Sequence, residues 1–173
     1  MLNRAFVVLA FALSLSCGNK DAGGTASGNP TAAPAAPAPL GPGISQDLKH
    51  NSEAPFYVFD SLGPVNYPAT QKGIQVPGDT DIGISGWALD VSKKGTAGGV
   101  DVVLDNVPHS ARYDMPRTDV ASHFNRPDYT NCGFQLILAR GQVSKGPHTV
   151  SVRVIASDKK SYNEGPVVQF TVN

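Results

Sequence analysis

The sequence predicts an all-β domain in residues 55–173, an antiparallel β-sandwich of about seven strands, and three observations support this. Short segments in which apolar and polar residues alternate recur along this region, which is the pattern of half-buried strands. Residues typical of turns, mainly Gly, Pro, Asn and Asp, fall between these segments. One long connection contains a stretch without Gly or Pro, which predicts a single short helix within an otherwise β domain.

Alternation is clearest late in the chain. Residues 134–138, 149–154 and 168–172 each place apolar side chains on one face and mostly polar ones on the other, and residues 82–89 and 100–104 are also strand-like. These segments supply large apolar residues that we expect to face the core: Ile82, Ile84, Trp87, Val100, Val102, Leu104, Phe134, Leu136, Leu138, Val150, Val152, Val154 and Phe170. Each contributes about 1.5–3 kcal/mol when fully buried, which suffices for an independent domain without a disulfide.

Shorter elements complete the predicted domain. Residues 57–59 and 74–76 are expected to be two pieces of one interrupted edge strand, and residues 111–113 form a further short strand. Residues 118–124 form the predicted helix, for which Thr118 or Asp119 is a suitable N-terminal cap.

The first seventeen residues are predicted to be a signal peptide. Arg4 precedes twelve uncharged residues, of which ten are apolar, and this segment is shorter than the roughly 20 residues that a membrane-spanning helix needs. The segment ends in Ser14-Leu15-Ser16-Cys17, which resembles the lipobox of bacterial lipoproteins, with its usual Leu and small residue displaced by one position. The resemblance implies that Cys17 is lipidated and becomes the N-terminus. The alternative is an ordinary secretion signal followed by a chance cysteine.

Residues 18–54 are predicted to be a disordered linker. Between residues 18 and 45, six Gly, seven Ala and five Pro make up most of the segment, which has too few large apolar residues to offset the entropy of ordering. The linker is expected to hold the domain away from a membrane surface. A Pro-rich recognition ligand is the alternative, although flanking Arg and Lys residues are missing.

The net charge of the chain bears on its partners, and the residue after Cys17 bears on which membrane holds it. Fourteen basic residues balance fourteen acidic ones, which argues against a nucleic-acid-binding protein. The lipoprotein resemblance implies an extracytoplasmic protein held at a membrane by its N-terminal lipid. Gly18, in a position where Asp would favour the inner membrane, favours the outer membrane if the host is Gram-negative.

Several sequence fragments come in a recognisable order. They are Gly86–Asp90, Gly99–Asp105, Ala111–Tyr113, Pro116–Val120, Asn131–Phe134 and Gly146–Val150. Their order resembles bacterial immunoglobulin-like sandwich modules with the motifs GWA-D, ARY, RPDVA and N-GF, over roughly residues 82–156, although Asn106 replaces a usual Gly and Thr118 a common Pro. The resemblance implies an immunoglobulin-like sandwich, used as an accessory module of extracytoplasmic proteins without a settled activity.

A candidate ligand-binding loop lies within residues 112–131. Long loops on a rigid scaffold often carry binding, and Arg and Tyr are enriched where proteins recognise partners. The candidate residues are Arg112, Tyr113, Arg117, Asp119, Asp128 and Tyr129. The alternative is structural: Arg–Asp pairs pin the loop while Tyr113 packs as a lid.

No motif for catalysis, a metal or a cofactor is present in the sequence. The four His residues lack metal-ligand spacing, so a zinc site made of His109, His123 and an Asp is only an alternative. The Asp pairs at 79 and 81 and at 101 and 105 lack the calcium-loop pattern. Cys132 matches no nucleophile motif, and we expect it to be buried as a small apolar residue. We therefore expect neither a cofactor nor an enzyme.

Together these observations predict a lipid-anchored cell-envelope lipoprotein that presents a binding or structural module to an envelope protein or glycan. Two alternatives stay open. One is a small extracytoplasmic hydrolase that uses the loop at residues 112–128, and the other is a subunit of an envelope assembly that docks through its edge strands.

Overall fold

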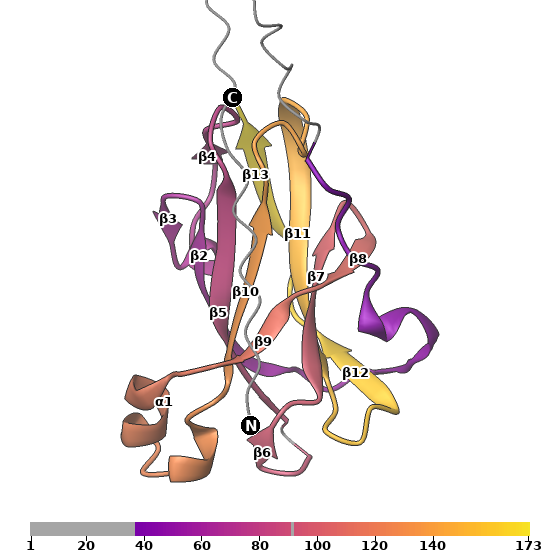
Figure 1. The fold of residues 1–173 in the computed structure, drawn as a ribbon, viewed down its shortest axis with the longest axis vertical. Coiled ribbons are helices and arrows are strands. Elements are labelled where there is room, and N and C mark those ends of the chain that lie inside the picture. The colour runs from indigo at the N-terminus through magenta and orange to yellow at the C-terminus, as the bar shows by residue number, and fades with distance from the viewer. Residues whose placement is uncertain (1–36, 91) are drawn as a thin grey trace, which may run out of the picture. The chain divides into compact units, whose positions relative to one another are not determined.

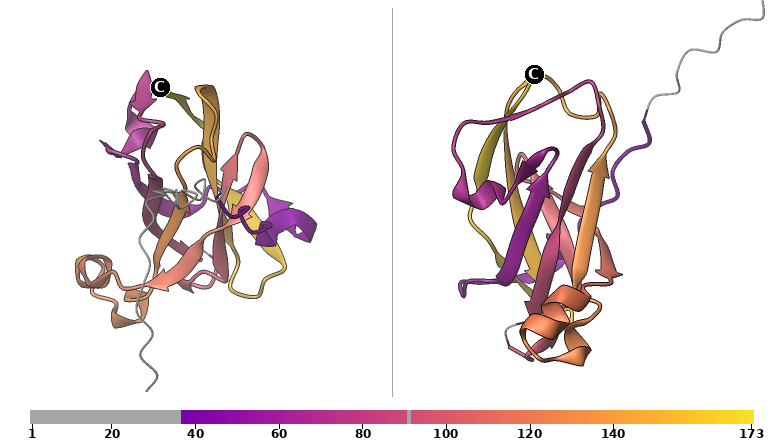
Figure 2. Two further views of the ribbon diagram at one scale, coloured as in Figure 1. Left: turned by 45° about the horizontal axis from the view of Figure 1, so that its top comes forward. Right: turned by 90° about the vertical axis from the view of Figure 1, so that its left-hand side faces the viewer.

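The computed structural model describes residues 37–90 and 92–173, which form two β-sheets packed face to face with one short α-helix at one end (Figures 1 and 2). The predicted all-β sandwich with a single short helix is confirmed. The predicted signal peptide, Cys17 and residues 18–36 of the predicted linker lie outside the described residues. Within the part that is described, no helix is long and apolar enough to cross a membrane.

The first sheet, sheet A, has seven strands, in the order β1-β12-β11-β13-β4, with β7 paired to β11 and β8 paired to β7. Its strands are β1 (Lys49–Asn51), β4 (Ile74–Val76), β7 (Gly99–Leu104), β8 (Val107–Ser110), β11 (Gly146–Ile155), β12 (Ser161–Glu164) and β13 (Val168–Val172). The pairs β1–β12 and β4–β13 are parallel, so the sheet is not wholly antiparallel as expected.

The second sheet, sheet B, has six strands, in the order β3-β2-β5-β10-β9, with β6 paired to β5. Its strands are β2 (Phe56–Leu62), β3 (Val65–Asn66), β5 (Ile82–Asp90), β6 (Gly95–Thr96), β9 (Arg112–Met115) and β10 (Gly133–Leu138). Residues 57–59 therefore belong to sheet B and residues 74–76 to sheet A. The prediction that they are two pieces of one edge strand is wrong, because the chain crosses from one sheet to the other between them.

The helical elements are short. They are the 3₁₀ helices η1 (Ile44–Asp47), η2 (Pro68–Thr70) and η3 (Pro127–Tyr129) and the α-helix α1 (Thr118–His123). The predicted helix is confirmed, but its predicted cap is wrong. Arg117 occupies the N-cap position and no side-chain hydrogen bond caps the helix, because an Arg side chain has only donors and cannot accept from a backbone N–H.

The sandwich has two apolar cores rather than one. The main core lies between the sheets and includes Ile82, Ile84 and Ala88 of β5. Successive side chains on a strand point to opposite faces, so Trp87 lies on the outer face of sheet B rather than in the main core, where we expected it. There, Trp87 packs with α1, η3 and the fully buried Cys132 in a second, smaller core. The expected burial of Cys132 is confirmed.

Residues 42–51, which we call the N-terminal strap, pack on sheet A. Pro42 forms a β-bridge with His109, and β1 pairs with β12. The buried carboxylate of Asp101 accepts hydrogen bonds from the backbone N–H groups of Ile44 and Ser45, at 2.9 and 2.7 Å. The expected disorder up to residue 54 is therefore wrong for this segment. It has few apolar residues to bury, and its backbone is instead held by hydrogen bonds to the sandwich.

Candidate functional site

The loop that the sequence singled out is tied together by ion pairs. The Arg117 guanidinium donates to both carboxylate oxygens of Asp119, at 2.9 and 2.7 Å, and to Asp60 of β2 at 2.5 Å. Nearby, Arg126 forms the same two-pronged contact with Asp128. The hydrogen bonds from Arg117 lower the pKa of Asp119 to about 2, so this carboxylate stays charged at neutral pH. These pairs fasten the loop to itself and to sheet B.

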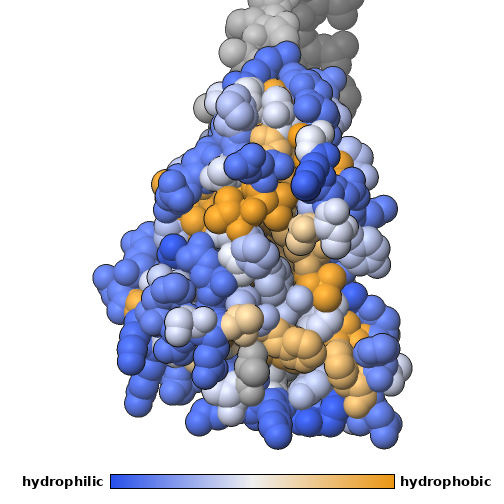
Figure 3. Space-filling model, turned by 180° about the vertical axis from the view of Figure 1, so that it is seen from behind, coloured by the Kyte–Doolittle hydropathy of each residue, from blue (hydrophilic) through white to orange (hydrophobic). Residues whose placement is uncertain are grey.

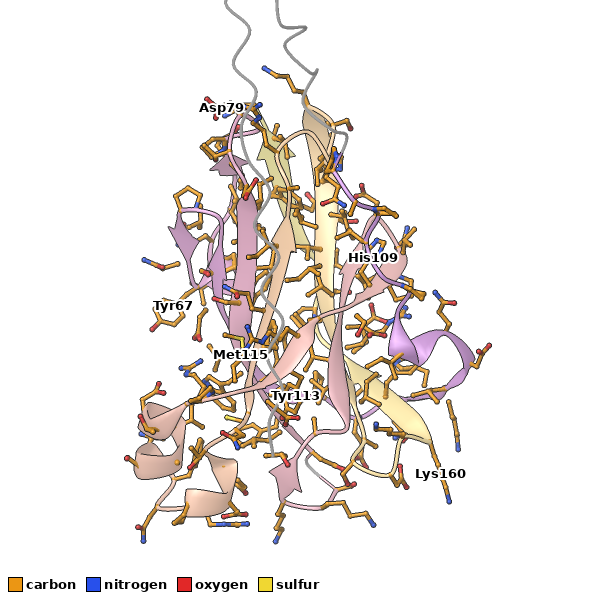
Figure 4. All side chains as sticks on the ribbon, in the orientation of Figure 1. Tyr67, Asp79, His109, Tyr113, Met115 and Lys160 are labelled. Carbon is orange, nitrogen blue, oxygen red and sulfur yellow. The ribbon has the colours of Figure 1, made fainter. Side chains whose placement is uncertain are left out.

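The two tyrosines of the predicted loop face inward. The Tyr113 hydroxyl donates to the Ala88 carbonyl at 2.8 Å and accepts from the Ala97 N–H at 3.0 Å, and burial raises the pKa of this phenol. Figure 4 shows Tyr113 in the interior near β9. Tyr129 is buried beneath the Arg126 guanidinium, which lies 4.5 Å from the ring centre. The Tyr113 hydroxyl and the Tyr129 ring are thus engaged in contacts within the protein.

Arg112 stands apart from this network. It lies exposed on β9 and pairs in the strand register with Gln135 of β10, whereas the other five candidate residues are buried or in contact with their loop neighbours. The arrangement corresponds to the alternative in which Arg–Asp pairs pin the loop.

A histidine to which the sequence gave no role lies between a carboxylate and a turn. His148 contacts the Asp105 carboxylate through Nδ1 at 2.7 Å and the Ser144 carbonyl through Nε2 at 2.8 Å, with the Ser144 hydroxyl 3.5 Å from Nε2. Burial opposes the charged imidazolium, but the hydrogen bonds to Asp105 and Ser144 outweigh it and raise the pKa of His148.

This Ser–His–Asp arrangement differs from a hydrolytic triad in one respect. A general base needs a free lone pair directed at the hydroxyl proton. Both ring nitrogens of His148 instead face oxygen acceptors, so both are placed to donate. The histidine therefore holds the turn before β11 and does not activate Ser144.

A groove runs beside β13 and is built from three adjoining hollows. The first, of about 400 Å³, is lined by Thr149, Gln169 and Thr171, among others. It shares Gly73 and Gln169 with a second hollow of about 340 Å³ beside η2. We call the three hollows together the β13 groove.

The third hollow forms the apolar end of the β13 groove. It has a volume of about 290 Å³, shares Ala69 with the second hollow and is lined by Tyr57, Tyr67 and Pro166. Figure 3, which shows the molecule from behind, reveals apolar patches bordered by hydrophilic residues. Sequence reasoning missed this groove because segments far apart in the chain form it and none carries a motif.

No metal site is evident in the described part of the chain. Within residues 37–90 and 92–173, no group of three His, Cys, Asp or Glu side chains is placed to hold a metal ion. His109 and His123, the two histidines of the zinc alternative, lie in β8 and at the end of α1.

Comparisons with known proteins find similarity among solved structures. No family model matches the chain, and no curated protein matches it. Among solved structures, the X-ray structure of the endo-beta-1,4-mannanase from Thermotoga petrophila is similar, with a TM-score of 0.43 and 9% sequence identity. The similarity covers 71% of this chain and 20% of the mannanase chain, so this chain spans only a small part of that protein's length.

Proposed function

We propose that the chain is a lipid-anchored lipoprotein of the bacterial cell envelope, whose β-sandwich is a non-catalytic binding module with an envelope protein or glycan as its partner. The observation that carries this proposal is the order of segments in the sequence. An uncharged apolar segment ends at Cys17, a Gly-, Ala- and Pro-rich segment follows, and a sandwich with its own core comes after it. A stable lipid anchor needs more than one acyl chain, and lipoprotein processing supplies several on one cysteine.

The sandwich supports a binding role more than a catalytic one. The ion pairs of the loop at residues 112–131 use the charges that a hydrolase would need, and both ring nitrogens of His148 face oxygen acceptors. The β13 groove, in contrast, is open and lined by side chains that can contact a partner. If the host is Gram-negative, Gly18 after Cys17 favours the outer membrane as the site of anchoring.

Replacing Cys17 tests the anchoring directly. The full-length chain and its Cys17→Ser variant are expressed in a bacterial host that is fed an alkyne-tagged palmitate, and label and membrane fractionation are followed. We expect the variant to lose the label and to leave the membrane fraction. Cys132→Ala is the matched control, because it removes the other cysteine of the chain, which is buried, and it should keep both label and location. Unchanged labelling of Cys17→Ser would remove the lipoprotein assignment.

A further inference from the structure

We propose that the β13 groove binds an uncharged, linear glycan along its length. This inference rests on the proposal that the sandwich is a binding module, and it names the class of ligand. The groove is elongated, since its three hollows adjoin through shared residues, and a chain-like ligand fits such a shape better than a compact one.

The aromatic end of the groove offers an exposed ring on a hydrogen-bonded backbone. The Tyr67 side chain projects from the side of the sandwich (Figure 4), and the residue is 58% exposed. Its N–H donates to the Asp60 carbonyl at 2.7 Å, and its own carbonyl accepts from the N–H and the hydroxyl of Thr70. A sugar ring has an apolar face of C–H groups, and packing that face on an exposed aromatic ring removes apolar surface of both from water.

The backbone of Tyr67 points to a positioned side chain. Its φ of 49° lies in the left-handed region, which non-glycine residues other than Asn and Asp seldom adopt. Such strain persists only where the surroundings impose it and is often found at ligand-binding sites. The hydrogen bonds of the Tyr67 backbone to Asp60 and Thr70 hold it in this conformation, so the point from which the side chain projects is set before a ligand arrives.

The other end of the groove offers neutral hydrogen-bonding groups. The side chains of Gln169 and Thr171 point outward from β13, because they alternate along the strand with the buried Val168, Phe170 and Val172. Within the described residues, neither side chain has a hydrogen-bond partner. Amides and hydroxyls both donate and accept, as sugar hydroxyls do.

Charge argues for a neutral ligand. Asp105 is the acidic residue among those that line the groove, and its two oxygens accept hydrogen bonds from His148 and the Thr149 backbone. Lys72 is the remaining charged lining residue apart from the His148–Asp105 pair. A polyanion would need several cations along its path.

The backbone of the groove floor argues against a peptide. A peptide that adds to a sheet needs an unpaired strand edge. β13 pairs with β11 on one side and, from Phe170 to Val172, with β4 on the other. Over Phe170–Val172 both edges of β13 are therefore closed to an added strand, and the outward side chains of Gln169 and Thr171 are what β13 offers to a ligand.

Calorimetric titration of the full-length chain in detergent tests the proposal. The probes are neutral hexasaccharides of β-1,4-linked glucose, mannose or N-acetylglucosamine, with a galacturonic acid hexasaccharide as the charged comparison. We expect at least one neutral hexasaccharide to bind more tightly than the charged one. Tyr67→Asn should weaken this binding at least about tenfold, which corresponds to about 1.4 kcal/mol, and Gln169→Ala should weaken it several-fold.

The variants are chosen so that a folding defect does not imitate the result. Asn accepts the left-handed backbone of residue 67, so Tyr67→Asn removes the ring without new strain. Gln135→Ala, on the outer face of the opposite sheet, is the control and should bind normally. Thermal unfolding of each variant confirms that it is folded.

Several outcomes would overturn the inference: no binding of any neutral hexasaccharide, equal binding of the charged one, or unchanged binding in both groove variants. The result is separable from the lipid anchor. Cys17→Ser should leave the membrane yet bind the hexasaccharide as before, so a failure of anchoring and a failure of glycan binding give different patterns.

Discussion

The attachment of the N-terminal strap to Asp101 makes a stability prediction. Asp101 is fully buried, and its two carboxylate oxygens each accept one backbone N–H of the strap. The substitution Asp101→Asn keeps the shape of the side chain but replaces one acceptor oxygen with an NH₂ group. One strap N–H then faces another donor, and the acceptor of the remaining hydrogen bond is no longer a charged carboxylate.

The magnitude follows from these two losses. A hydrogen bond to a charged group contributes about 1.5–3 kcal/mol and a neutral one about 0.5–1.5 kcal/mol, while a buried donor without a partner costs about 1–3 kcal/mol. We therefore expect Asp101→Asn to lower the free energy of unfolding by about 2–4 kcal/mol. For a domain of this size, that corresponds to a fall in Tm of roughly 10 °C.

Urea and thermal unfolding measure the loss, and hydrogen exchange locates it. Exchange should accelerate at the amides of Ile44 and Ser45 before it does so in the sheets. The matched control is Asp158→Asn, which makes the same chemical change where an exposed carboxylate accepts the Lys160 N–H at 3.1 Å. That variant should stay within about 0.5 kcal/mol of wild type. Equal stability of the two variants would refute the reasoning.

Three further predictions concern the sheets, a histidine and the loop. Gly86→Ala should lower the free energy of unfolding, measured in urea, by about 3 kcal/mol, because the new Cβ would overlap the Val58 carbonyl oxygen of β2. Gly83→Ala should be tolerated, because the space around Gly83 is open. Because the fold raises the pKa of His148, the charged imidazolium stabilises the folded protein, and this stabilisation declines as pH rises above about 6.5. Unfolding midpoints measured below and above that pH should show the decline in the wild type, and His148→Gln should abolish it. Arg117→Ala should lower the free energy of unfolding by about 1–3 kcal/mol, and Arg126→Ala should lower it less, because the ion pair of Arg126 is exposed to solvent.

The alternation of apolar and polar residues predicted the strands that have one buried and one exposed face. The alternation at residues 134–138, 149–154 and 168–172 lies within β10, β11 and β13, because one buried and one exposed face impose that period. The same rule, applied from Ile82 and Ile84, would have placed Trp87 on the outer face. Its size alone led to the prediction that it faces the main core.

Other features depend on contacts between distant residues. The strap resembles a linker in composition, and it is ordered by a carboxylate 57 residues further along the chain. The sequence of β12 has no apolar alternation, so local pattern could not predict this strand. It forms through its pairing with β1 and β11. At the candidate site, Arg and Asp residues in the loop could be named from the sequence. Their pairing, and the groove formed by segments near residues 57, 67–73, 149 and 166–171, required the fold.

The route of the strap determines how the sandwich would respond to tension from its N-terminal side. Such a pull reaches the Pro42–His109 bridge first, then the two hydrogen bonds to Asp101, and then the pairing of β1 with β12. The strap residues of these contacts come before β2 and before every residue that lines the β13 groove along the chain. Tension from the N-terminal side is therefore expected to extend the strap before it reaches the groove.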